Sequence, residues 1–317
     1  MLLGIPRGHF YYDYYLFADR LFRDSGIEIL YGCENSEDTL KRGRDLAVDE
    51  ACVPMKLVAG QLDYLEDKCD RILLPRVMKD YMGRWLCPKL LGLPELMSCK
   101  TSEAKYLITE PLKFNDKKDL SKRLWKVCSE AGMKRAVFTE AFEDAYGIIA
   151  DIAGGRRYGH TEAGWEFAPQ PPGPGEIILP NNKKIFLAGH CYTVYDRFIN
   201  MDIVRKLDEF GITVLTEKDV LRSDAERCVR DAGLVKPPYW EAFVRLYGAA
   251  LHMRDKVDGI IYISSFSCGL DSFIIEMIKT HITDVPMMVL KLDEHRGRAG
   301  FETRLEAFSD LLQRSAS

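Results

Sequence analysis

The sequence lacks the features that mark several common functional classes. It has no phosphate-binding loop of the form G-x-x-x-x-G-K-S/T, and no G-x-G-x-x-G fingerprint follows a predicted strand, so we expect no nucleotide site. No apolar run approaches the about 20 residues that span a bilayer. The net charge of −4, without a basic stripe or tail, argues against nucleic-acid binding. We therefore expect neither a membrane nor a nucleic acid as a partner.

The composition is that of a globular protein. Hydrophobic residues make up 47% of the chain and charged residues 29%, and 317 residues are enough for two domains. The N-terminal segment begins apolar, but Arg7, His9 and Asp13 interrupt it, which makes it a poor signal peptide. Nine cysteines, an odd and irregularly spaced set, fit a reducing compartment better than a disulfide framework. These observations predict a cytoplasmic protein.

Short β-rich runs alternate with amphipathic helical stretches, the pattern of parallel α/β units. We predict an α/β fold of two Rossmann-like parallel-sheet domains facing a cleft, with helical segments between them. The N-terminal α/β domain with a helical extension is placed at 1–153, a Gly/Pro-rich linker at 154–183 and the C-terminal α/β domain at 184–317. The predicted strands are 2–6, 27–32, 71–77 and 104–109, then 184–190, 212–217, 259–265 and 286–293. Helices of the second half are expected at 197–210, 239–254, 269–282 and about 300–313.

Three cysteines carry most of the chemical information. Cys52 in DEACVP, Cys87 in WLCPKLLGLP and Cys268 in ISSFSCGLDS each lie in a Pro- or Gly-containing loop, and each is expected after a buried strand. Loops at the carboxyl ends of parallel strands form the sites of open α/β sheets. Three thiolates suit an iron–sulfur cluster with one open iron. However, the chain has no C-x₂-C run, and a single cysteine is more often a small buried hydrophobe.

These segments resemble one family. Their motifs occur in the order found in proteins related to the activator of 2-hydroxyacyl-CoA dehydratase. These motifs are GIPRGHFYYDYY, VDEACVPMKLVAGQLDYL, RILLPRV followed by WLCPKLLGLPEL, and SFSCGLDSF with KLDEHRGRAGFETRLEAF. That family includes free-standing chains and the rear part of large ATP-dependent activases. It is more distantly similar to the dehydratase subunits and to double-cubane cluster proteins. The resemblance covers nearly the whole chain apart from about 155–182.

The resemblance implies a 4Fe–4S cluster on Cys52, Cys87 and Cys268. It also implies that a separate ATP-dependent activase supplies low-potential electrons, which the protein transfers or uses in anaerobic metabolism. One alternative is a dehydratase-like enzyme acting on a 2-hydroxyacyl-CoA, for which a CoA thioester would be a ligand. Another is a non-enzymatic accessory subunit that docks an activase, so whether the chain is an enzyme stays open. A homodimer is expected by family analogy only.

The chain departs from the family pattern at Gly189–His190–Cys191–Tyr192, where a G-H-P-Y-like turn is expected. Cys191 follows a predicted strand and could be a fourth cluster ligand, which would close the cluster and favour electron transfer. The alternative is a small loop residue. Three cysteines with His190 or Cys191 would also satisfy a structural zinc ion. His190 is therefore assigned to the cofactor site.

Other polar residues follow predicted strands. Glu294 and His295 are the catalytic candidates, because they precede a Gly-containing turn that could bind a phosphate, and His295 titrates near neutrality. The alternative is structural, with His295 paired to Arg304 and Glu302 serving the first helical turn. Arg7 and Arg76 each follow a proline at a strand end and could neutralise cluster charge or bind a substrate anion. Pairing with Asp49 or Glu50 is the structural alternative.

Overall fold

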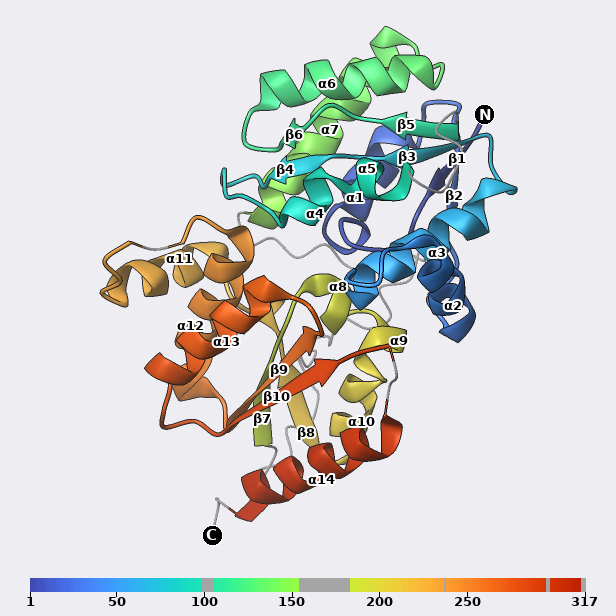
Figure 1. Cartoon of the computed structure of the whole chain (residues 1–317). Coiled ribbons are helices and arrows are strands. Elements are labelled where there is room, and N and C mark those ends of the chain that lie inside the picture. The colour runs from blue at the N-terminus through green and yellow to red at the C-terminus, as the bar shows by residue number, and fades with distance from the viewer. Residues whose placement is uncertain (99–104, 154–182, 237, 295–296, 315–317) are drawn as a thin grey trace. The chain divides into compact units, whose positions relative to one another are not determined.

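The computed structural model describes residues 1–98, 105–153, 183–236, 238–294 and 297–314. The chain forms two compact units (Figure 1). Unit 1 contains the described residues up to 153 together with Tyr239–Glu241, and unit 2 contains the other described residues. The linker predicted at 154–183 lies outside the described residues except for its last residue. Both units combine parallel sheets with helices, which confirms the predicted α/β class.

Unit 1 has a four-stranded parallel sheet in the order β2-β1-β3-β5, and a short parallel pair, β4-β6. Ser36 and Asp116 accept backbone hydrogen bonds at the starts of two helices, α2 and α6, as capping residues do. The strands are β1 Leu2–Ile5, β2 Glu28–Tyr31, β3 Arg71–Leu74, β4 Val77–Lys79, β5 Tyr106–Ile108 and β6 Leu112–Lys113. The helices are α1 Tyr11–Phe22, α2 Glu37–Leu46, α3 Val53–Glu66, α4 Pro88–Leu91, α5 Leu93–Ser98, α6 Lys117–Glu130 and α7 Arg135–Ala153.

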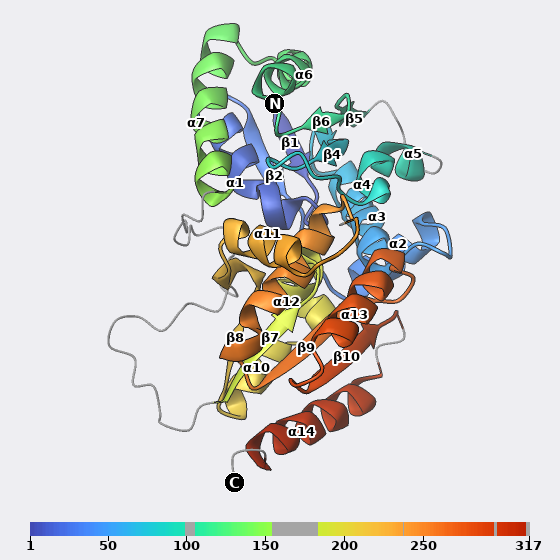
Figure 2. The same cartoon turned by 90° about the vertical axis from the view of Figure 1, so that its left-hand side faces the viewer.

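Unit 2 has a four-stranded parallel sheet in the order β10-β9-β7-β8. Helices α12 and α13 cover one face and α10 and α14 the other (Figures 1 and 2). Right-handed crossovers account for the opposite positions of α10, between β7 and β8, and α13, between β9 and β10. The strands are β7 Lys183–Ala188, β8 Ile212–Leu215, β9 Gly259–Ser265 and β10 Met287–Leu292. The helices are α8 Cys191–Val194, α9 Arg197–Asn200, α10 Ile203–Glu209, η2 Glu217–Asp219, α11 Arg222–Asp231, η3 Phe243–Tyr247, α12 Gly248–Met253, η4 Arg254–Lys256, α13 Gly269–His281 and α14 Arg298–Arg314.

Several sequence-based boundaries are wrong for identifiable reasons. The helix predicted at 197–210 is broken, because Met201 and Asp202 both adopt left-handed backbone with φ of 57° and 58°. The strand predicted at 71–77 ends at Leu74, directly before Pro75, which has no N–H to continue the ladder. Cys52 does not follow a strand, since it lies between α2 and α3. Helix α11 was not predicted.

A short segment from the second half of the chain pairs with unit 1. The N–H of Trp85 donates to the carbonyl of Tyr239 at 3.2 Å, and the N–H of Glu241 donates to the carbonyl of Trp85 at 2.8 Å. Trp85 and Trp240 thereby form an isolated parallel bridge. The first unit is thus completed by backbone that comes from far along the chain.

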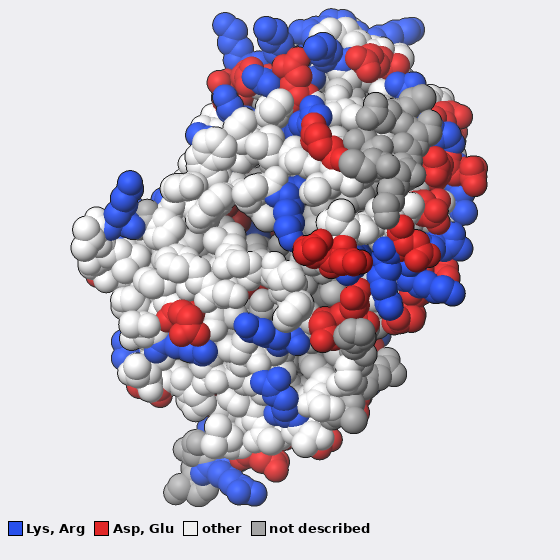
Figure 3. Space-filling model, in the orientation of Figure 1, with Lys and Arg blue, Asp and Glu red and all other residues white. Residues whose placement is uncertain are grey.

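Charged side chains are mixed on the face shown in Figure 3. Lysines and arginines gather over α6 near the top of this view, with acidic residues beside them. This mixture agrees with the near-balanced composition. Among the described residues, no helix has both the length and the apolar character that crossing a membrane requires.

Helices α2 and α3 approach each other closely at two glycines. A Cβ on Gly43 would lie 1.7 Å from the carbonyl oxygen of Lys56, and a Cβ on Gly60 would lie 1.9 Å from that of Thr39. Backbone atoms cannot give way as a flexible side chain can. We therefore expect Gly43→Ala to lower the free energy of unfolding by about 1–3 kcal/mol, measured by urea denaturation.

Gly147 in α7 is the matched control, because it is exposed and no atom lies within 4 Å of its added Cβ. Alanine is the better helix former, so Gly147→Ala should stabilise the protein by up to about 1 kcal/mol. Equal effects of the two substitutions would contradict the close helix contact.

Candidate functional site

The candidate site of unit 2 lies where two neighbouring strands end. His190 follows the carboxyl end of β7 and Cys268 follows that of β9, and these strands are adjacent in the sheet. The connection from β7 leads to β8 on one side, while β9 leads to β10 on the other. The order of the strands therefore reverses between β7 and β9. Open α/β sheets bind ligands at such a reversal, outside the carboxyl ends of the strands.

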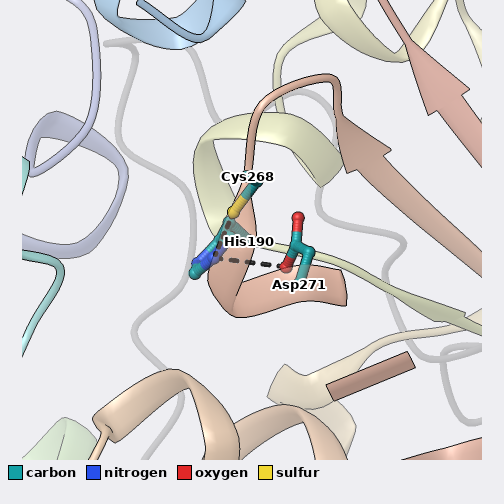
Figure 4. Close-up of side chains that lie close together, drawn as sticks. All are labelled: His190, Cys268 and Asp271. Atoms are coloured by element: carbon teal, nitrogen blue, oxygen red, sulfur yellow. Dashed lines mark hydrogen bonds and ion pairs between the residues drawn. The ribbon is translucent and has the colours of Figure 1, made fainter. Parts of the chain in front are cut away.

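Three side chains meet at this position (Figure 4). The Nε2 atom of His190 lies 3.3 Å from Oδ1 of Asp271 and 3.9 Å from Sγ of Cys268. All three ligand atoms lie within 4.8 Å of one another. His190 is 5% exposed and Asp271 1%, whereas Cys268 is half-buried. An imidazole, a carboxylate and a thiol thus converge in a largely buried place.

Neighbouring tyrosines of unit 2 hold His190 and Asp271 by a ring stack and a hydrogen bond. The hydroxyl of Tyr262, in β9, donates to Oδ1 of Asp271 at 2.7 Å. Burial raises the pKa of Tyr262 well above its ordinary value, and the negative charge of Asp271 is the next largest cause. The hydroxyl therefore keeps its proton and remains a donor. The ring of His190 stacks on that of Tyr192, with centroids 4.9 Å apart. Both His190 and Asp271 are therefore held in one orientation.

The backbone at the site is also constrained. A Cβ on Gly189 would lie 2.6 Å from the carbonyl oxygen of Ile263, so only glycine fits beside β9 directly before His190. Ser267, directly before Cys268, has a left-handed φ of 68°. Such strain in a residue other than glycine costs of order 1 kcal/mol and is common at functional sites. The turn thus positions Cys268 at some cost in stability.

Substitutions of two fully buried tyrosines of unit 2 test whether the hydrogen bond to Asp271 stabilises the protein. Tyr262→Phe removes the hydrogen bond to a buried carboxylate, so we expect it to lower the free energy of unfolding by about 1.5–3 kcal/mol. Tyr247 is equally buried, but its hydroxyl has no hydrogen-bond partner among the described residues. Tyr247→Phe should therefore be neutral or slightly stabilising. Similar urea midpoints for the two variants would contradict the role of Tyr262.

The three cysteines predicted as cluster ligands share one structural position. Cys52, Cys87 and Cys268 are the N-cap residues of α3, α4 and α13, and none of their side chains makes a capping hydrogen bond. Backbone N–H groups at a helix start can donate hydrogen bonds to an anionic group bound there. Cys52 is buried, and the other two are half-buried. Two of these cysteines belong to unit 1 and one to unit 2.

Cys191 occupies a different position. It is the first residue of α8 rather than its N-cap, and it is 1% exposed. Although it follows His190 directly, it is not one of the three grouped side chains of unit 2. The structure thus distinguishes Cys191 from the other three predicted metal ligands by burial and by position.

Arg7 and Arg76 follow β1 and β3, which are neighbours in the sheet of unit 1. The strand order reverses between these two strands as it does in unit 2, so both arginines lie at the corresponding position. The guanidinium of Arg7 lies 5.7 Å from the ring centroid of Tyr11, and Arg76 forms an ion pair with Glu95. Glu95, rather than Asp49 or Glu50, is the partner shown for Arg76.

The catalytic candidates are only partly described. Glu294 lies two residues after β10 and is half-buried, whereas His295 lies outside the described residues. Around them, Arg304 donates to the carbonyl of Val289, and Glu302 pairs with Lys206. Glu302 and Arg304 thus have structural contacts, and Glu294 is not part of the His190 group.

Sequence reasoning missed Asp271 and Tyr262. Asp271 stands in the motif C-G-x-D-S, three residues after Cys268, and a first-turn position could have signalled it. Tyr262 lies within an apolar strand and carries no such signal. Its role depends on the packing of β9 against α13.

The comparison with protein families agrees with the resemblance noted in the sequence. The family model of the CoA enzyme activase uncharacterised domain (DUF2229) matches residues 3–220, more than half of the chain. The chain belongs to this family. The resemblance to activase-related proteins is thereby confirmed. The matched residues include Cys52, Cys87, His190 and Cys191, while Cys268 lies beyond them. No curated protein matches the chain.

Proposed function

We propose that this activase-related protein binds an iron–sulfur cluster of the 4Fe–4S type through Cys52, Cys87 and Cys268. It would receive low-potential electrons from a separate ATP-dependent activase and transfer or use them. The observation that carries the proposal is the shared N-cap position of the three cysteines. Since the sequence contains no phosphate-binding loop, we propose that ATP hydrolysis takes place on the separate activase.

The donor set fits such a cluster. Thiolates are the usual ligands of iron–sulfur clusters, and backbone N–H groups at a helix start stabilise negative charge on the sulfur. Three cysteines leave one iron of a four-iron cluster without a cysteine. When bound, the cluster would supply one-electron chemistry at low potential. The protein's part is to hold the thiolates and to orient the polar side chains near Cys268.

Anaerobic reconstitution of the full chain tests the proposal. We expect about four irons and four acid-labile sulfides per chain, and a paramagnetic signal after reduction with titanium(III) citrate. The control is Cys128→Ala, because Cys128 is a 1% exposed core residue of α6 and its loss should leave the iron content unchanged. Wild-type protein without iron and sulfide after reconstitution would refute the cluster and favour an accessory role.

A further inference from the structure

We propose that unit 2 also forms a site for one divalent transition-metal ion, with His190, Cys268 and Asp271 as its three protein ligands. The site requires only residues of unit 2, so it does not depend on the three-cysteine cluster. Cys268 belongs to both sets, and an ion and a cluster therefore exclude each other at this thiol. The ion-bound form is the state expected when no cluster is present.

The distances suit ligands of a single ion. For a tetrahedral zinc-type ion, bonds of about 2.3 Å to sulfur and about 2.0–2.1 Å to nitrogen and oxygen place the sulfur and nitrogen about 3.6 Å apart. The same geometry places nitrogen and oxygen about 3.4 Å apart. The observed separations from Nε2 of His190 are 3.9 Å to Cys268 and 3.3 Å to Asp271. The third pair, Sγ of Cys268 and a carboxylate oxygen of Asp271, lies within 4.8 Å, whereas the same geometry needs about 3.6 Å. Cys268 would therefore have to move toward the other two ligands for all three to bind one ion.

The same distances do not suit two ligands of one cluster. Each iron of a four-iron cluster takes one protein ligand, so two protein ligands of such a cluster are separated by the cluster itself. His190 and Cys268 lie too close together for that arrangement. His190 is therefore better placed to share an ion with Cys268 than to serve as a fourth cluster ligand.

The burial of Asp271 provides an independent observation. Its Oδ1 atom accepts from Tyr262 and faces His190, but its Oδ2 atom is buried and has no hydrogen-bond partner among the described residues. A buried carboxylate loses its hydration and needs hydrogen bonds or a cation in return. A divalent ion bound through Oδ1 next to His190 and Cys268 would compensate the negative charge of the carboxylate as a whole in this buried place. Tyr262 would then hold the carboxylate ligand in place, as groups behind a metal ligand commonly do.

The ligand set indicates which ions are suitable. One thiolate, one imidazole and one carboxylate match Zn²⁺, Fe²⁺ or Co²⁺ better than Mg²⁺ or Ca²⁺, which prefer oxygen ligands. Three protein ligands leave one tetrahedral position open, as in catalytic rather than structural zinc sites. A small anion or a water molecule could take that position.

Titration of the metal-free, reduced full chain with Co²⁺ tests the site, because tetrahedral cobalt has visible d–d bands and a thiolate charge-transfer band. We expect one ion per chain in the wild type, with both types of band. His190→Ala, Cys268→Ala and Asp271→Asn should each weaken binding by at least about tenfold. Cys52→Ala and Cys87→Ala are the matched controls and should bind cobalt as the wild type does.

Three results would overturn the inference. These are a wild type without a thiolate–cobalt band, loss of the band in Cys52→Ala and Cys87→Ala, and full binding by His190→Ala. If His190→Ala fails to fold by circular dichroism, His190→Gln keeps the size and polarity of the residue and takes its place. Failure of the cluster is recognised separately, by the lack of sulfide after reconstitution. Cobalt binding in such a protein would still support the ion site.

Discussion

Reconstituted Cys268→Ala protein is expected to lose most of the iron and acid-labile sulfide that the wild type holds, and Cys52→Ala and Cys87→Ala should do the same. A cluster held by only three thiolates has no protein ligand to spare, so loss of any one leaves a second iron without a cysteine. The loss should occur whichever unit supplies the missing ligand. Iron and sulfide counted per chain under anaerobic conditions give the measurement.

Cys191→Ala is the informative comparison for these three variants. Its side chain is 1% exposed and it is not an N-cap residue, so we expect the variant to keep nearly all of its iron. If Cys191→Ala also loses its iron, the cluster has four cysteines and is closed, which favours electron transfer alone. If the three N-cap variants keep their iron, the proposed ligand set is wrong.

The second large effect is a loss of stability at alkaline pH. Burial raises the pKa of Cys128 to about 12, and burial is also the main cause of the raised pKa values of Tyr31, Tyr195 and Tyr262. Each group stays protonated in the folded protein at a pH where the unfolded chain releases its proton. Unfolding therefore releases protons above about pH 9 for the cysteine and above about pH 10 for the tyrosines.

The free energy of unfolding should fall by about 1.4 kcal/mol per pH unit for each such group. Urea denaturation at pH 8, 9, 10 and 11 in a reducing buffer measures the fall. Both units should be affected, because Cys128 and Tyr31 belong to unit 1 and the other two tyrosines to unit 2. Cys128→Ala should show a shallower fall between pH 9 and 11, and Tyr195→Phe a shallower fall above pH 10. A stability that is constant up to pH 11 would contradict the burial of these groups.

The sequence predicts the class of fold well, because buried strands and amphipathic helices have distinct periods. It fails where the pattern is weak. Helix α11 is mostly polar and buries only Ala225 and Val229, so its apolar pattern is too short to predict a helix. The break between α9 and α10 lies at Met201 and Asp202, which have left-handed backbone although neither is a glycine. The sequence therefore contains no glycine there that would indicate the break.

The candidate site could be predicted only in parts. The sequence indicates Cys268 as one of three loop cysteines and His190 by its place in the turn Gly189–Tyr192. Their meeting depends on β7 and β9 being neighbours, and the order of strands in a parallel sheet cannot be read from their order along the chain. Tyr262 and Asp271 are separated by nine positions, and their hydrogen bond exists only because α13 returns along β9.

The pairing of Trp85 with Tyr239–Glu241 limits how the protein can be divided. Since the segment belongs to unit 1 while its flanking residues belong to unit 2, the chain passes between the units more than once. A fragment that ended at residue 153 would leave the N–H and carbonyl of Trp85 without the partners they have in the whole chain. No single cut of the polypeptide, whether by a protease or by splitting the gene, can therefore release two intact halves.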